Sequence, residues 1–411
     1  MQIQRALAST SLVLWLTVTS GASTAASAAA QPPPPAQAGV RFSLPEATGR
    51  HLVGTTELHL VDRERRDPWA ADRERELMVS IWYPARHALG HPVQPYMPAG
   101  VARHVDESGS FDLAAPGEVD WAGVSTRATV NAPAEDRAGR RPVVLYSPGL
   151  EVSRTLGTST VIDLASRGYV VVTMDHTYET PAVEFPGGRV ELHKPMSGTE
   201  DLKKVMATRV SDTRFVLDQL ALLHQGHNPD AEERRLPKHL GKTLDLERLG
   251  MFGHSGGGAT AAQSMHEDRR IDAGINLDGA LQFNDEDFLP VARQGLDRPF
   301  MLMGKTNQTH LTKPSWQALW NHSTGWKRDL SLDGGSHFSY TDAQSFVPAL
   351  DARLDIPAPL REQYIGTVDA HRSTAAQRAY ITAFFDQHLR GRPQGLLNGP
   401  SPSHPDIRFI N

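Results

Sequence analysis

The 411-residue sequence contains no cysteine. A thiol enzyme is therefore excluded, and so is a lipid anchor carried by a cysteine at a mature N-terminus. Without disulfides, an exported form of this chain has to be stabilised by its core alone. We expect a soluble, released protein built around a sizeable hydrophobic core.

The sequence also lacks an excess of positive charge. Its net charge is −5 with 22% charged residues, so nothing indicates the basic stripe of a nucleic-acid-binding protein. Two clusters, Asp62–Asp67 and Asp72–Glu76, mix both signs and are interpreted as solvated surface. The histidines at 51, 59 and 87 show no clustered ligand spacing, and we expect neither a metal nor a cofactor.

Charge is nearly absent from the first forty residues, where Arg5 is the only ionised side chain. An apolar run, Ser11–Thr19, follows it, and small residues then offer Ala-x-Ala cleavage sites that end at Ala28 or Ala30. This layout is typical of a secretory signal peptide over residues 1–30. The run is shorter than the ~20 residues that span a bilayer, so stable membrane insertion is not expected.

The remaining chain is expected to form one domain. Residues 31–40 are rich in proline and predict a stiff linker. Residues 41–411 then form the domain, in which the segment of about residues 176–240 is a possible lid or cap. We expect the mature protein to be secreted.

Strand-like and helix-like segments alternate along most of this domain. Strands are predicted at 55–61, 76–84, 141–149, 169–175, 272–278, 298–304 and 326–335, and helices at 158–168, 199–224 and 375–391. This order predicts an α/β fold with a doubly wound, mostly parallel sheet, antiparallel strands at its N-terminal edge and helices on both faces. Such sheets carry their sites at the carboxyl ends of the strands.

One serine stands in a glycine-rich turn between a predicted strand and a predicted helix. Gly253-x-Ser255-x-Gly257 fits the nucleophile elbow, in which a sharp turn exposes a serine at the start of a helix. The alternatives are a glycine-rich helix start with a serine N-cap, or a phosphate loop. A phosphate loop is disfavoured because no lysine follows the glycines.

A serine nucleophile needs a base and an acid, which in this type of fold follow it in the order acid, then histidine. Asp278 comes directly after a predicted strand, whereas Asp272 and Asp297 precede theirs, so Asp278 is the predicted acid. The alternative for Asp278 is a turn aspartate before a glycine.

The predicted base is His337. It follows a predicted strand, and Gly334 and Gly335 make the loop flexible enough to carry the ring over the sheet. Its rivals are His310, His322, His371, His388 and His404. Surface exposure is the alternative interpretation for each of them.

An oxyanion hole needs two backbone donors near the serine. The N–H of Gly256, directly after Ser255, is one candidate, and the N–H of Leu150 in the loop after an earlier strand is the other. His254, Asp175 and His176 are further candidates, for contacts with substrate. His254 has an alternative role as a packing or orienting residue, and the other two belong to a segment that follows a strand.

The chain resembles the plasma, or type II, platelet-activating-factor acetylhydrolases and their bacterial relatives. The resemblance rests on motifs in family order across about residues 50–345, among them VVLYSPGLEVSR, GYVVVTMDHTYE, MFGHSGGGA, INLDGAL and GGSHFSYTD. It implies an α/β-hydrolase fold, with the family's nucleophile, acid and base on Ser255, Asp278 and His337.

The resemblance also implies an activity. Members of the family hydrolyse short or oxidised acyl groups from the sn-2 position of phospholipids without calcium. Two departures stand out: Gly256 occupies a position where relatives often carry a bulky residue, which predicts a wider acyl pocket, and the match around His337 is looser.

Taken together, the sequence predicts a secreted serine ester hydrolase. The expected partner is a small-molecule ester of a short-chain carboxylic acid, or a phospholipid with an sn-2 ester. The alternatives are a broad carboxylesterase or lipase, a polyester hydrolase, and a non-catalytic binding protein on the same fold.

Overall fold

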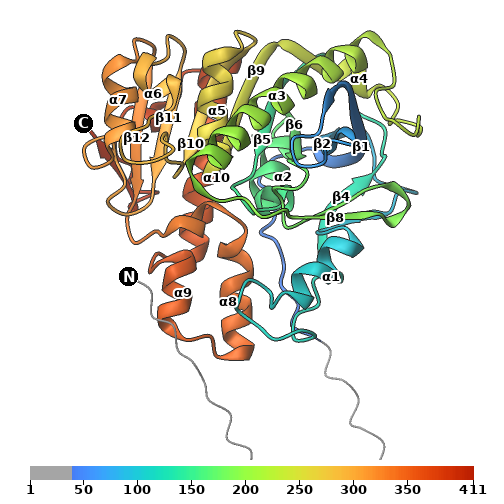
Figure 1. Ribbon diagram of the computed structural model, residues 1–411, viewed down its shortest axis with the longest axis horizontal. Coiled ribbons are helices and arrows are strands. Elements are labelled where there is room, and N and C mark those ends of the chain that lie inside the picture. Colours follow the sequence, from blue (N-terminus) through green and yellow to red (C-terminus); the bar gives the residue numbers. More distant parts are fainter. Residues whose placement is uncertain (1–38) are drawn as a thin grey trace, which may run out of the picture. The chain divides into compact units, whose positions relative to one another are not determined.

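The computed structural model describes residues 39–411, which form one compact unit. The predicted signal peptide and most of the predicted linker lie outside the described residues. An 11-stranded sheet runs in the order β13-β12-β11-β10-β9-β5-β6-β2-β1-β4-β3. This is the α/β-hydrolase type of sheet, with helices packed against it (Figure 1).

The strands belong to one large sheet and one separate hairpin. The strands of the large sheet are β1 (Leu52–Arg66), β2 (Glu74–Ala85), β3 (Val93–Pro95), β4 (Ser125–Val130), β5 (Arg141–Ser147), β6 (Val170–Asp175), β9 (Leu244–His254), β10 (Ile271–Leu277), β11 (Phe300–Gly304), β12 (Lys327–Leu332) and β13 (Ile407–Ile410). A separate hairpin pairs β7 (Ala182–Glu184) with β8 (Val190–Leu192).

The helices lie mostly between strands. They are α1 (Ala99–Glu107), α2 (Thr158–Ser166), α3 (Gly198–Gln225), α4 (Leu240–Thr243), α5 (Gly256–Glu267), α6 (Pro290–Gln294), α7 (Pro314–His322), α8 (Ala343–Leu354), α9 (Ala358–Ile365) and α10 (Ala370–Arg390).

The direction of the strands confirms the predicted sheet. β6, β5, β9, β10, β11 and β12 pair in parallel, and β2 joins them through antiparallel pairing with β6. One antiparallel strand was not expected: β13 closes the opposite edge by pairing with β12. It has four residues, which is too short a run to give a period.

Alternate side chains of the central strands supply two core layers. In β5, Val143 and Leu145 pack with residues of α3, α5, α6 and α7, whereas Val144 and Tyr146 pack with residues of α2 and α10. Successive side chains of a strand point to opposite faces, so the continuous apolar run is explained by helices on both faces. This core fixes the carboxyl ends of the strands.

A third core cluster joins α1, α8 and α9, which lie together on the lower side of Figure 1. The sequence did not predict α8 or α9. Pro348 stands inside α8, and a proline removes a backbone donor and usually ends a helical pattern. The cluster covers the side of the domain from which α9 contacts the loop after β12.

The interpretation of the two mixed-charge clusters as solvated surface was wrong for two of their members. Arg75 and Asp67 are 0% and 2% exposed. Arg75 Nη1 lies 2.9 Å from Asp67 Oδ2, and its Nη2 lies 2.6 Å from Oδ2 of Asp212 in α3. Charged side chains can be buried when they are paired and hydrogen-bonded, and sequence alone does not show the partner that α3 brings.

Candidate active site

Ser255 occupies a sharp turn between β9 and α5. Its backbone has φ 54° and ψ −123°, a conformation that non-glycine residues rarely adopt. The turn depends on close backbone contact: a Cβ on Gly253 would lie 2.3 Å from the carbonyl carbon of Gly257, and one on Gly257 would lie 1.9 Å from the carbonyl oxygen of Ser147. Both glycines of the motif are therefore required by the space available.

The structure brings Ser255, His337 and Asp278 into one hydrogen-bonded chain. His337 Nε2 lies 2.9 Å from Ser255 Oγ, and His337 Nδ1 lies 2.5 Å from Asp278 Oδ2. The His337 side chain is 33% exposed, whereas the Asp278 side chain is fully buried. A buried carboxylate that accepts Nδ1–H leaves Nε2 free to accept the proton of the serine hydroxyl.

Asp278 follows β10 and is fixed by its neighbour β11. Its backbone has φ 59°, and its N–H donates to the carbonyl of Met303 over 2.9 Å. The second carboxylate oxygen, Oδ1, accepts the backbone N–H of Lys305 over 2.8 Å. Both oxygens of Asp278 are thus hydrogen-bonded, which orients the carboxylate toward His337.

The loop that carries His337 is anchored rather than free. The carbonyl of Gly334 accepts the N–H groups of Thr367 (2.7 Å) and Val368 (3.1 Å). Ser336 and Ser339 cap the short helix that begins at His337 through reciprocal hydrogen bonds. The predicted flexibility of the Gly334–Gly335 pair is therefore used to shape this turn, in which Gly334 has φ 72°.

His254, the residue before the serine, has no exposed surface. Its Nε2–H donates to the backbone carbonyl of His337 over 2.9 Å, and its Nδ1 is buried without a partner. Burial, helped by the charge of His337, lowers the pKa of His254 to about 3. The ring is therefore neutral near pH 7, and its contacts favour the orienting role over contact with substrate.

The two candidate backbone donors border one space. Leu150 belongs to the loop Pro148–Leu150, here called the β5 loop. The backbone nitrogen of Leu150 lies 3.3 Å from the position that a Cβ on Gly256 would take. Gly256 is the first residue of α5, so its N–H has no acceptor within the helix.

The side chain of Leu150 fills the space above Gly256. Its Cγ lies 2.9 Å from the position of a Cβ at residue 256. The wider pocket predicted from a glycine at this position is therefore not found directly above it, because an apolar side chain from the β5 loop occupies that volume.

Asp175 and His176 are both fully buried. Asp175 Oδ1 accepts the N–H of Arg154 over 2.7 Å, and the Arg154 guanidinium also pairs with this carboxylate. His176 bridges Ser147 Oγ (3.0 Å) and Asp212 Oδ2 (2.9 Å). These contacts leave neither side chain available to a substrate in this structure and give both a structural role.

A second serine, histidine and aspartate, Ser147, His176 and Asp212, repeat the residue types of the first set but are sealed from solvent. All three are 0% exposed, and burial with the nearby charge of Arg209 lowers the pKa of His176 to about 4. A carbonyl substrate has no access to Ser147. This second set lies under the β5 loop and supports it.

A rival histidine, His310, has a carboxylate partner of its own. His310 Nδ1 lies 2.7 Å from Asp329 Oδ2, and the ring stacks on Trp320 with centroids 4.1 Å apart. Burial raises the pKa of Asp329 to about 6. No serine or threonine hydroxyl in the described part of the chain is hydrogen-bonded to this ring, so the pair lacks a nucleophile.

A small cavity of about 130 Å³ lies next to the β5 loop. Its walls come from the β5 loop and the residue after it, and from the sequence segment before and within α3, namely Leu150, Glu151, Glu179, His193, Met196, Ser197, Gly198, Asp201, Leu202 and Val205. An apolar cavity of about 150 Å³ holds one benzene molecule. The cavity beside Leu150 is smaller than this and therefore has the size of a short acyl chain.

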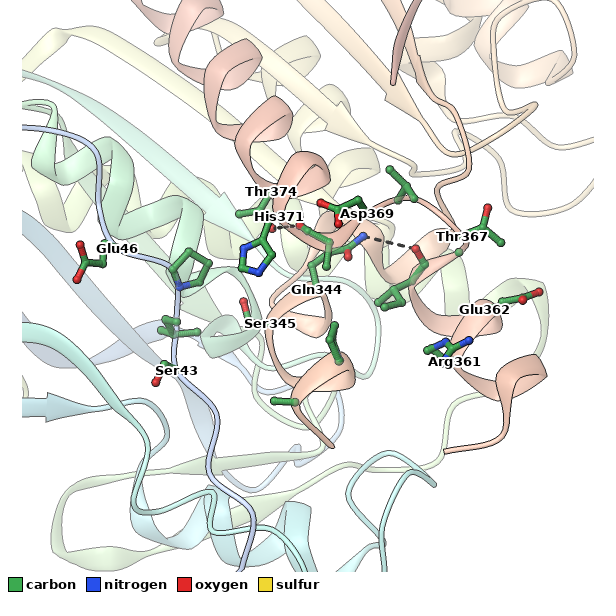
Figure 2. A pocket seen from close by; sticks show the side chains of 18 of the residues that line it. Ser43, Glu46, Gln344, Ser345, Arg361, Glu362, Thr367, Asp369, His371 and Thr374 are labelled. Carbon is green, nitrogen blue, oxygen red and sulfur yellow. Dashed lines mark hydrogen bonds between the residues drawn. The ribbon is translucent and has the colours of Figure 1, made fainter. Parts of the chain in front are cut away.

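Another cavity, of about 910 Å³, lies between the segment around Ser43 and Glu46 and the helices that carry Gln344 and His371 (Figure 2). It is an open hollow lined by residues 43–46, by part of α8 and by residues 361, 362, 365–371 and 374. Arg127 and Arg361 on its rim are already paired with Glu46 and Asp351. Neither Ser255 nor His337 lines it.

The described residues show no metal cluster and no membrane span. No group of three or more histidine or acidic side chains within residues 39–411 could hold an ion. None of the helices in that range is long and apolar enough to cross a membrane.

Sequence reasoning missed the residues under the β5 loop, above all Arg209. This arginine is 1% exposed and lies on the inner face of α3 with Val205, Asp212 and Val216. A signal was present, because positions 205, 209, 212 and 216 share one face of a helix. Two charged residues on an otherwise apolar face predict a buried, paired arginine.

Comparison with known proteins finds relatives of one family. A sequence model of the family "Platelet-activating factor acetylhydrolase, isoform II" matches residues 38–187 and 191–380. A probable 1-alkyl-2-acetylglycerophosphocholine esterase of Arthroderma benhamiae is 29% identical over 394 residues, covering 90% of this chain and 94% of the relative. A platelet-activating factor acetylhydrolase of Cavia porcellus is 25% identical over 260 residues, 57% of this chain and 55% of the relative.

A solved structure is also similar. The ferulic acid esterase from Streptomyces cinnamoneus superimposes with a TM-score of 0.72 at 38% identity, covering 90% of this chain and 99% of the esterase. Fold, elbow geometry and these relatives agree, and the chain is therefore an ester hydrolase that belongs to the platelet-activating factor acetylhydrolase isoform II family.

Proposed function

We propose that Ser255, His337 and Asp278 form the catalytic triad of a serine ester hydrolase that works through an acyl-enzyme. The observation that carries this proposal is the hydrogen-bonded chain Ser255 Oγ to His337 Nε2 (2.9 Å) and His337 Nδ1 to Asp278 Oδ2 (2.5 Å). The strained turn at Ser255 exposes the hydroxyl at the N-terminus of α5, where the helix dipole favours negative charge.

In the first half of the reaction, His337 Nε2 takes the proton of Ser255 Oγ while this oxygen bonds to the ester carbonyl carbon. The carbonyl oxygen becomes an oxyanion, which accepts hydrogen bonds from the N–H groups of Leu150 and Gly256. His337 then donates its proton to the leaving alcohol as the carbon–oxygen bond breaks. Asp278 stabilises the imidazolium and keeps Nδ1 protonated.

In the second half, water gives a proton to His337 and attacks the acyl carbon. The tetrahedral intermediate uses the same two N–H groups, and His337 returns the proton to Ser255 Oγ as the carboxylic acid leaves. The N–H of Leu150 donates to no backbone acceptor within residues 39–411, which leaves it free for this role.

For the acyl group we propose the cavity beside Leu150. Its volume of about 130 Å³ accommodates an acetyl or similarly short chain, and the name of the Arthroderma benhamiae relative specifies an acetyl ester. We propose short-chain carboxylic esters as substrates, including sn-2 acetyl phospholipids. Within segment 176–240, the part before the core helix α3 stays our candidate for a lid, because it contributes His193, Met196 and Ser197 to the cavity wall.

A second substrate class is favoured by the ferulic acid esterase, which is 38% identical. A feruloyl group is larger than benzene, so this class requires the cavity of about 130 Å³ to widen toward solvent. Acetyl, butyryl and octanoyl p-nitrophenyl esters, an sn-2 acetyl phospholipid and methyl ferulate should be compared by kcat/KM. Turnover of methyl ferulate without phospholipid turnover would assign the second class.

The triad is tested by Ser255→Ala. We expect ester turnover to fall by about 10⁶-fold, the loss seen when a serine hydrolase loses its nucleophile. A fluorophosphonate probe should label the native chain on Ser255 and leave the variant unlabelled. Near-normal turnover by the folded variant would refute the assignment.

We also propose that the chain is exported, on the sequence of residues 1–30 alone. Expression of the full chain should release a protein into the medium that begins after Ala28 or Ala30, as read by N-terminal sequencing. A cell-retained protein with an intact N-terminus would contradict this.

A further inference from the structure

The β5 loop is held from below by one buried side chain. Arg209, in α3, donates from Nη1 to the carbonyl of Pro148 over 2.7 Å and from Nη2 to the carbonyl of Gly149 over 3.0 Å. Its side chain is 1% exposed, so solvent does not compete for these hydrogen bonds. We propose that Arg209 is a positioning residue that aims the Leu150 N–H at the oxyanion.

The connection between Arg209 and this N–H is covalent and planar. The carbonyl oxygen of Gly149 and the N–H of Leu150 belong to the same peptide unit, in which a trans bond makes them point in opposite directions. Fixing the oxygen toward Arg209 therefore fixes the N–H toward Gly256. The Leu150 nitrogen lies accordingly 3.3 Å from the position of a Cβ on Gly256.

The positive charge of Arg209 strengthens this arrangement in addition to orienting the peptide. A hydrogen bond from an ionised guanidinium to a peptide oxygen is stronger than one between neutral groups. It also polarises the peptide, which strengthens the hydrogen bond that the N–H at the other end can donate. Arg209 thus increases the capacity of Leu150 to stabilise negative charge without touching the substrate.

Arg209 is itself held in place on two sides. Its Nε lies 2.5 Å from Glu179 Oε2, and Glu179 is also 1% exposed. On the other side, Nη1 lies 3.4 Å from Ser147 Oγ, which is bound by His176 over 3.0 Å. The sealed set of Ser147, His176 and Asp212 therefore serves as the support for Arg209 and the β5 loop.

The inference rests on the proposed function, because it takes the Leu150 N–H as an oxyanion donor. It predicts a loss in kcat with little change in KM, since an oxyanion forms only in the transition state. A merely structural arginine would instead lower stability and leave the kcat of the folded fraction unchanged.

The test uses separate variants of the full chain. Arg209→Met alone leaves Glu179 buried and unpaired, which can prevent folding, so the main variant is Arg209→Met with Glu179→Gln. Arg209→Lys keeps a cation beside Glu179 but cannot bond both carbonyls in the same fork. The matched control is Arg378→Met: Arg378 is 5% exposed and donates to the carbonyls of Pro45, Glu46 and Ser159, away from the triad.

For the double variant we expect kcat to fall about 100-fold, the effect of losing one oxyanion donor. Because Glu179 also lines the proposed acyl cavity, KM is compared with that of Glu179→Gln alone, and the two KM values should agree within about threefold. The affinity for an alkyl boronic acid, which forms a tetrahedral adduct on the serine, should fall in proportion to kcat/KM. Arg209→Lys should lie between the double variant and the native chain, and Arg378→Met should lose stability with an unchanged kcat.

A folded double variant with a native kcat and native boronic acid affinity would overturn the inference. Failure of the proposed function gives a different pattern, because Ser255→Ala would then retain turnover. If Ser255→Ala is inactive and the double variant is fully active, the triad holds and only the role of Arg209 is refuted.

Discussion

His254, the last residue of β9, donates its Nε2–H over 2.9 Å to the backbone carbonyl of His337, in the loop that follows β12. The two rings lie 4.6 Å apart. The residue before the nucleophile therefore ties the nucleophile's own strand to the base. This hydrogen bond helps to keep the distance between Ser255 and His337 constant.

His254→Leu removes the link and should reduce kcat about tenfold, the equivalent of one neutral hydrogen bond. His254→Gln offers an amide donor at similar reach and should restore most of the activity. Steady-state kinetics on both variants decides the matter. Equal activity of the leucine variant and the native chain would show that the loop is held without His254.

Two buried histidines should make the fold sensitive to acid. The folded-state pKa values of His254 and His176 are lowered to about 3 and about 4, mainly by burial, from 6.5 in the unfolded chain. A depressed pKa means that the unfolded chain binds the proton first, so stability is complete above pH 6.5 and is lost as pH falls toward 4. The melting temperature should stay constant between pH 7.5 and pH 6.5 and should decrease as pH falls from 6.5 to 4.5.

His254→Gln tests this assignment because it removes one of the two titrating groups. The melting temperature of this variant should fall less steeply with decreasing pH than that of the native chain. Parallel curves would place the acid sensitivity elsewhere.

Asp278→Asn should keep the fold and abolish most of the activity. The asparagine oxygen can still accept the N–H of Lys305, which Asp278 Oδ1 accepts over 2.8 Å. The amide nitrogen would face His337 Nδ1 and force the proton onto Nε2, so the ring could no longer accept the serine proton. We expect kcat to fall about 10⁴-fold with an unchanged circular dichroism spectrum. A loss below tenfold would remove Asp278 from the triad.

Two neighbouring glycines should respond differently to a methyl group. A Cβ on Gly257 meets the backbone oxygen of Ser147 at 1.9 Å, so Gly257→Ala should destabilise the elbow by more than about 4 kcal/mol. A Cβ on Gly256 meets the side chain of Leu150 at 2.9 Å, and Leu150 is 38% exposed and can move. Gly256→Ala should therefore fold but lose kcat.

Combining Gly256→Ala with Leu150→Ala removes the side chain in conflict while keeping the Leu150 backbone N–H. We expect kcat to recover most of its loss in this double variant, measured as a double-mutant cycle. Additive losses would show that the two residues do not share the space above Ser255.

Much of the site could be predicted from the sequence, because its residues stand in short, recognisable sequence patterns. Ser255 stands in a glycine pattern that only a strand–turn–helix connection explains, and Asp278 directly follows a continuous apolar run. The carboxyl ends of parallel strands meet at one edge of a sheet, so these positions converge without further information. Candidate contacts such as Asp175 were harder, because a residue at a strand end can point into the protein as well as out of it.

The alternation of strands and helices, the elbow at Ser255 and the order of acid and base can be read along the chain, since each follows from periodicity and turn chemistry. The partners of the buried charges follow from the folded arrangement instead. Arg209 and Gly149 are 60 residues apart, and Arg75 and Asp212 are 137 apart, and neither pair has a local signature. Burial of a charge depends on a partner that packing brings within hydrogen-bonding distance, and that distance exists only in the folded chain.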